Sequence, residues 1–260
     1  MYKTFIIHLF LFLTLLSGSN DLKSHNQQVV YQVGTIGSLL AGVYEGDVSM
    51  NDLSNFGDFG LGTFDGANGE MIAFNNNFYR ADAHGNANIV QNMHTPFAVV
   101  TNFSATNQYK LEEFENLNSL HGFIKTKFDS DNLIYAVLIE GNFSSVYLRS
   151  EYPQLEGHKP LLQTISQVQQ EFRFENTKGT IVGFWFPKYM SNLNVAGFHF
   201  HFLNDKTSHG GHMIDMKLKS GVLKIMPIYD FKMHLIDTNR FRKTNLDKDF
   251  KSAAKKVEHR

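Results

Sequence analysis

Three histidines late in the chain have the spacing of a metal site. His199 and His201 alternate with phenylalanines in the segment Gly197-Phe-His-Phe-His-Phe202, and Gly-Gly-His212 follows after a polar loop. Because side chains alternate between the two faces of a strand, we expect both imidazoles on one face and the phenylalanines on the other. If residues 204–211 form a hairpin loop, His212 returns beside His201, and three nitrogens can occupy three corners of a tetrahedral site. The fourth corner would stay open for a ligand.

This ligand set indicates zinc. Three neutral imidazoles leave Zn²⁺ with its full double positive charge, which favours stabilising an anion on a bound oxygen. The sequence contains no cysteine, which excludes thiolate ligands, disulfides and a cysteine nucleophile. His209 is an alternative to His212, but it lies in the expected loop, where its position is less well fixed. The histidines without a partner at ligand spacing are interpreted as ordinary polar residues: His84, His94, His121 and His158.

Three charged residues elsewhere could complete a site. Glu70 follows Asn-Gly at the expected start of a strand, where it either enters the core or faces water. Arg149 closes another expected strand and could hold a substrate carboxylate with its planar guanidinium, with an ordinary surface position as the alternative. Glu258 lies in the basic C-terminal tail, where a solvated, mobile side chain is the default expectation.

Composition and the N-terminus limit the partners and the location of the protein. The 260 residues are 42% hydrophobic, which is enough for a substantial core, and 24 basic residues balance 25 acidic ones. Without a basic field we expect no nucleic-acid partner. Residues 1–19 combine Lys3, a short apolar run and small residues, the pattern of a signal peptide, with an uncleaved anchor as the alternative. We therefore expect a secreted or periplasmic protein without a stable membrane anchor, its domain spanning residues 20–260.

The distribution of apolar residues predicts an α+β fold rich in strands. We expect two closely packed β-rich layers, a mixed sheet plus a smaller sheet or a barrel-like half, with a few short helices in one unit. A homodimer is expected on general frequency alone. The predicted helices lie within residues 46–58, 111–120 and 159–172. The predicted strands are residues 61–64, 70–74, 78–79, 96–100, 133–139, 145–148, 180–186 and 195–203.

Several segments, in order, resemble the bacterial-type alpha-acetolactate decarboxylase family. The resemblance runs from about Tyr31 to the C-terminus. One departure is Asn68, where the family commonly has Asp before its Gly-Glu pair, and both residues suit a turn. The segments that carry the resemblance are residues 31–46, Gly57-Asp-Phe-Gly-Leu-Gly-Thr-Phe64, Gly69-Glu-Met71, Thr95-Pro-Phe-Ala98, Gly183-Phe-Trp-Phe-Pro187, Gly197-Phe-His-Phe-His-Phe202 and Gly210-Gly-His212.

The resemblance implies zinc-dependent decarboxylation of 2-acetolactate to acetoin and carbon dioxide. Zinc would stabilise the enediolate that remains after loss of carbon dioxide. Arg149 would orient the substrate carboxylate, and Glu70 or Glu258 would protonate the enediolate. Two alternatives remain open: a secreted zinc hydrolase with Glu70 as general base, and a non-catalytic β-rich metal-binding module. By motif match, the implied zinc ligands are His199, His201 and His212, the catalytic residues are Glu70, Arg149 and Glu258, and the substrate-binding residues are Thr63 and Arg149.

Overall fold

The computed structural model describes residues 28–154 and 159–258. The predicted signal peptide and His158 lie outside these ranges. Among the described residues, none of the helices combines the length and the apolar character that crossing a membrane would need.

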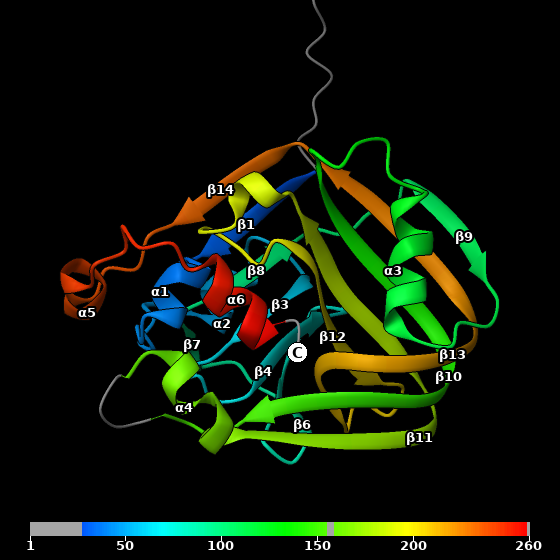
Figure 1. The fold of residues 1–260 in the computed structure, drawn as a ribbon, viewed down its shortest axis with the longest axis horizontal. Coiled ribbons are helices and arrows are strands. Elements are labelled where there is room, and N and C mark those ends of the chain that lie inside the picture. Colours follow the sequence, from blue (N-terminus) through cyan, green and yellow to red (C-terminus); the bar gives the residue numbers. More distant parts are fainter. Residues whose placement is uncertain (1–27, 155–158, 259–260) are drawn as a thin grey trace, which may run out of the picture.

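A seven-stranded mixed sheet forms one layer of the molecule (Figure 1). All neighbouring strands in it are antiparallel except β1 and β14, which run parallel. A two-stranded sheet, β2 (Val48–Ser49) with β7 (His94–Thr95), accompanies it. In spatial order the seven strands are β14 (Asp230–His234), β1 (Val29–Val33), β8 (Ala98–Thr101), β3 (Phe59–Thr63), β4 (Glu70–Phe74), β5 (Asn77–Ala81) and β6 (Ala87–Ile89).

A five-stranded antiparallel sheet forms the second layer and curls on itself. Its strands follow the order β10, β11, β12, β13 and β9, and β10 also pairs with β13, so four of the strands close into a ring. This is the barrel-like half that the sequence predicts. The strands are β10 (Ile134–Glu151), β11 (Gln169–Phe186), β12 (Gly197–Asn204), β13 (Gly210–Ile228) and β9 (Asn107–Leu111).

Three of the short helices lie together at the junction of the two layers. Helices α1, α4 and α6 contact one another, and Figure 1 shows α6 near the middle of the molecule, at the end of the described chain. The helices are α1 (Ile36–Leu40), α2 (Met50–Leu53), α3 (Leu117–Lys125), α4 (Leu161–Val168), α5 (Asn239–Lys243) and α6 (Lys251–Glu258), with a 3₁₀ turn η1 at Lys188–Met190.

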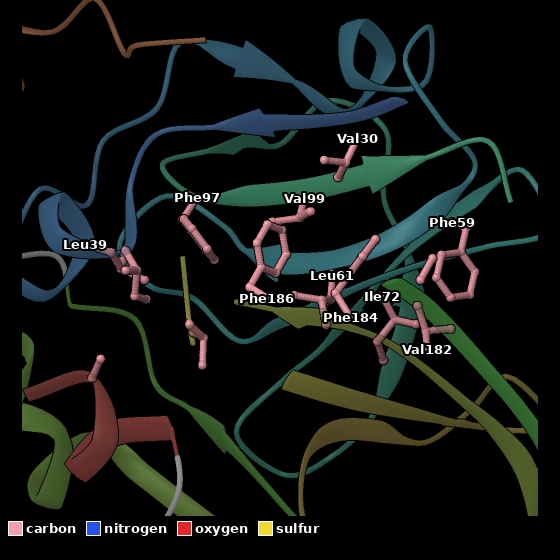
Figure 2. Close-up of a cluster of buried hydrophobic side chains, with 14 of the residues drawn as sticks. Val30, Leu39, Phe59, Leu61, Ile72, Phe97, Val99, Val182, Phe184 and Phe186 are labelled. Carbon is pink, nitrogen blue, oxygen red and sulfur yellow. The ribbon is translucent and has the colours of Figure 1, made fainter. Parts of the chain in front are cut away.

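The main core lies between the two layers. Leu61 and Ile72 of the first sheet pack with Val182 and Phe184 of β11, all nearly inaccessible to solvent (Figure 2). A second cluster fills the concave side of the curled sheet, and a third lies on the other face of the seven-stranded sheet. The α+β class with two packed β-rich layers is therefore confirmed.

Two of the predicted helices have the wrong limits. Residues 111–120 do not form one helix, because Leu111 still pairs with Gly221 of β13 and α3 begins only after the cap Asn116. The helix predicted at 159–172 ends at Val168, because Gln169 and the residues after it pair with β10. In both places, pairing with a distant strand overrides the local helical periodicity.

Candidate metal centre and active site

The three predicted histidines meet in one buried cluster. His201 of β12 lies directly opposite His212 of β13, and His199 projects to the same face two residues earlier. The ring centroids are 4.9 to 5.4 Å apart. One nitrogen from each ring lies within 4.8 Å of the others, so the three side chains could hold a metal ion.

Hydrogen bonds at the far side of two rings determine which nitrogens face the cluster. Nδ1 of His201 donates to the carbonyl oxygen of Met71 at 2.8 Å, which leaves its Nε2 as the acceptor atom. Nε2 of His212 lies 3.2 Å from the carbonyl oxygen of Glu258, which leaves Nδ1. The Nε2 atoms of His199 and His201 are 3.2 Å apart. Two ligand nitrogens on a tetrahedrally coordinated ion such as zinc are about 3.4 Å apart, so this pair of nitrogens has a suitable separation for binding one metal ion.

Burial keeps two of the imidazoles neutral, as metal ligation requires. It lowers the pKa of His201 to about 3, although the hydrogen bond to Met71 opposes the shift. It also lowers the pKa of His212 well below its ordinary value, and the nearby positive charge of Arg149 adds to this effect. Both rings can therefore offer a lone pair across the neutral pH range.

Glu70 and Glu258 point their carboxylates at the ligand nitrogens. Oε2 of Glu70 is 3.1 Å from Nε2 of His201, and Oε2 of Glu258 is 3.6 Å from both Nε2 of His199 and Nδ1 of His212. Glu70 begins β4 directly after Gly69, whose φ of +82° and close approach to the Ala81 carbonyl suit glycine. Glu70 is buried and does not face water. The expectation of a solvated, mobile side chain is wrong for Glu258, because α6 turns it inward and its side chain is only 8% exposed.

Arg149 is buried in the same place instead of lying on the surface. It occupies β10 opposite His212 of β13 and is 2% exposed. Its Nη1 donates to the carbonyl oxygen of Val257, and to Oε1 of Gln169 at 3.1 Å. Its Nη2 lies 3.4 Å from Oε2 of Glu258. A cation, two carboxylates and three imidazoles thus converge.

A small inner cavity adjoins the cluster. Thr63, which pairs with Glu70 across β3 and β4 and donates to the carbonyl oxygen of Gly69 at 2.7 Å, lies on its wall. The cavity has a volume of about 30 Å³ and is also lined by Arg149 and His199. An open cleft of about 730 Å³ reaches the same cluster from outside, with Arg149, His212 and Glu258 on its wall.

Glu151 is a site residue that the sequence analysis missed. It lies two residues after Arg149 on the same face of β10, is 8% exposed and lines the inner cavity. Burial raises the pKa of Glu70 well above its usual value, and the charge of Glu151 adds to the shift. Burial also raises the pKa of Glu151, although Arg149 opposes that. Strand alternation from Arg149 is the signal that could have identified this residue.

Among the residues that the structure describes, the other histidines are not part of the ligand cluster. His209, the alternative to His212, stacks near Phe174 at 4.8 Å between ring centroids, with Nδ1 3.3 Å from the Gly85 carbonyl oxygen. His84 bonds Tyr152, and His94 is in β7. His121 stacks on a phenylalanine of β12 and lines the outer cleft, so it lies closer to the site than its interpretation as an ordinary polar residue suggested.

Burial of His201 predicts a pH-dependent stability of the metal-free protein. Its pKa is about 3 when folded and about 6.5 when unfolded, so below pH 6.5 the unfolded chain binds a proton that the folded chain does not. Stability is then lost as the pH falls from 6.5 towards 3, by about 2 kcal/mol between pH 6.5 and about 5. We expect urea unfolding of the wild type in the presence of a chelator to show this loss of unfolding free energy. The His201→Asn variant should show a smaller loss over the same pH range. Equal losses in the two proteins would contradict the assignment.

Known proteins show the same sequence pattern and fold. A family model described as alpha-acetolactate decarboxylase matches residues 30–248. The alpha-acetolactate decarboxylase of Methanosarcina mazei is 41% identical over 241 residues, which cover 92% of this chain and 83% of the relative. The Bacillus subtilis protein of the same name is 36% identical over 230 residues, covering 88% and 90%.

Solved structures agree with the sequence relatives. The crystal structure of alpha-acetolactate decarboxylase from Bacillus subtilis strain 168 superposes with a TM-score of 0.86 at 34% identity, covering 89% of this chain and 100% of that one. A Staphylococcus aureus structure described as similar to alpha-acetolactate decarboxylase has a TM-score of 0.82 at 31% identity, covering 88% and 98%. The resemblance predicted from the motifs is confirmed: the chain belongs to the alpha-acetolactate decarboxylase family of carboxy-lyases.

Proposed function

We propose that this protein converts 2-acetolactate into acetoin and carbon dioxide, with zinc held by His199, His201 and His212. The observation that carries the proposal is the convergence of three buried imidazoles, a buried arginine and buried carboxylates on one small cavity. The family to which the chain belongs supports the same reaction. When bound, the zinc ion would supply a Lewis acid for the negative charge that develops on the substrate oxygens.

Arg149 positions the substrate carboxylate. Hydrogen bonds to Gln169 and to the Val257 carbonyl oxygen fix the orientation of its guanidinium. The guanidinium can then orient the substrate carboxylate so that the carbon–carbon bond that breaks is perpendicular to the plane of the substrate ketone. Glu258 shares the same guanidinium. A cation that is partly neutralised binds the ground-state carboxylate less tightly, which favours its departure as carbon dioxide.

Glu70 delivers the proton that replaces carbon dioxide. Its pKa is raised, first by burial and then by the charge of Glu151, and this favours the protonated carboxyl that a proton donor needs. The site thereby stores an acid beside the reacting carbon without contact with bulk water, since Glu70 is 7% exposed. Glu258, beside Arg149, keeps its role as the partner of the cation.

We also propose that residues 1–19 are removed on export and that residues 20–260 form the mature domain. Support for this comes from the leader pattern in the sequence. Mass spectrometry of the protein recovered outside the cytoplasm would test this by identifying its N-terminal residue.

The reaction itself is tested with the purified mature chain and racemic acetolactate. We expect acetoin to form in proportion to bound zinc, and a chelator to abolish it. Zinc should be quantified in the same sample. Bound zinc with ester or amide hydrolysis but no acetoin would favour the hydrolase, and zinc without any activity would favour the metal-binding module.

Each ligand histidine should be needed for metal retention. His199→Ala, His201→Ala and His212→Ala should lose most of the bound zinc, because two ligands cannot complete the tetrahedral site. His209→Ala is the matched control and should keep the metal, because its ring lies against Phe174. Metal analysis of the purified variants checks this. Full occupancy in a variant would remove that histidine from the ligand set.

Arg149 should be needed for turnover and not for zinc. Arg149→Lys keeps a charge but loses the planar fork, so the substrate is misoriented and kcat/KM should fall by roughly 100-fold. Steady-state kinetics, zinc analysis and circular dichroism are measured together, with the exposed Arg242→Lys as control. Wild-type kinetics in Arg149→Lys would contradict its positioning role.

A further inference from the structure

One wall of the inner cavity is apolar and is built by three helices. Leu39 of α1, Leu161 of α4 and Val257 of α6 line the cavity, and Phe97 of the loop before β8 joins them (Figure 2 shows Leu39 and Phe97). All four are almost completely buried, at 2% to 5% exposure. Helices α1, α4 and α6 pack against one another, so this wall has fixed dimensions.

The rest of the lining is mainly polar and carries the reacting groups, and it is called the polar wall here. Glu70, His199 and Arg149 lie there. An apolar wall offers no partner to a carboxylate, a ketone or a hydroxyl, and burying such a group against it would cost free energy. A substrate whose oxygens all face the polar wall must therefore turn its alkyl groups to the helices.

The cavity leaves little room for such groups. Its volume is about 30 Å³, which is the space of only a few small groups, since a single water already needs about 10–15 Å³ on the same measure. One added methylene in an apolar pocket of fixed size changes discrimination about 10- to 200-fold. The side chains that close the apolar wall therefore control the size of the alkyl group.

We infer that Leu161 is a specificity-determining residue, which limits the alkyl group on the hydroxyl-bearing carbon of the substrate. The inference rests on the proposed decarboxylation and deepens it, because it names the residue of the cavity wall that selects the size of this alkyl group. Leu161 is the first residue of α4, and its side chain makes no hydrogen bond. Shortening this side chain therefore removes apolar contacts and leaves the hydrogen bonds of the helix in place. Arg149, Glu70 and the ligand histidines stay untouched by the change.

Adjacent leucines of the same helix supply the test. Leu161 is 5% exposed and lines the cavity, whereas Leu162 is 37% exposed and does not line it. Leu161→Ala, Leu162→Ala and the wild type are each assayed with 2-acetolactate and with its 2-ethyl and 2-propyl homologues. The measured quantity is the ratio of kcat/KM for each homologue to kcat/KM for 2-acetolactate.

We expect Leu161→Ala to raise this ratio by about tenfold or more, mainly through KM, and Leu162→Ala to leave it at the wild-type value. Leu161→Phe should lower it. If Leu161→Ala does not fold, Leu161→Val and Val257→Ala widen the same wall and should raise the ratio in the same direction. Unchanged ratios in all the cavity variants, with acetoin still formed, overturn the inference alone. Absence of acetoin from the zinc-loaded wild type overturns the proposed function.

Discussion

The site depends on the register between β13 and its two neighbours. His212 lies opposite His201 of β12 and also opposite Arg149 of β10, so one residue of β13 joins the metal cluster to the substrate cation. A slip of one residue in either pairing would turn a whole set of side chains to the other face. The closed ring of β10, β11, β12 and β13 makes such a slip difficult, because each strand is fixed on both sides near the site.

Burial gives these groups their chemistry and also requires partners for them. A buried guanidinium or imidazole N–H without an acceptor is strongly destabilising, and here backbone carbonyls of distant segments supply the acceptors. Met71 accepts from His201, Val257 from Arg149, and Glu258 from His212. Two of these carbonyls belong to α6, so docking of this helix supplies two of the acceptors at the same time as it closes the cavity.

The sequence predicted the parts of this site that depend on local geometry. Strand alternation placed His199 and His201 on one face, and the hairpin length returned His212 to them. Arg149 and Glu258 were assigned by resemblance, because their burial depends on each other across a long stretch of chain. Glu151 was missed because the predicted strand ended at residue 148, so the alternation that places Glu151 on the same face as Arg149 was not followed to the end of β10. The limits of α3 and α4 were wrong because pairing of β9 with β13 and of β11 with β10 outweighs helical periodicity.

Arg149 and Glu258 line both the inner cavity and the outer cleft. The pair therefore forms the boundary between solvent and the buried acid Glu70, and a substrate that reaches the cavity from the cleft must pass it. An ion pair of maximal strength would be a poor boundary, because opening it would cost several kcal/mol. The observed separation of 3.4 Å is longer than a close charge-assisted hydrogen bond, so Glu258 leaves the guanidinium able to bind a substrate carboxylate beside it. In the proposed reaction, Arg149 would therefore meet the substrate carboxylate at the entrance to the cavity, with Glu258 still its partner.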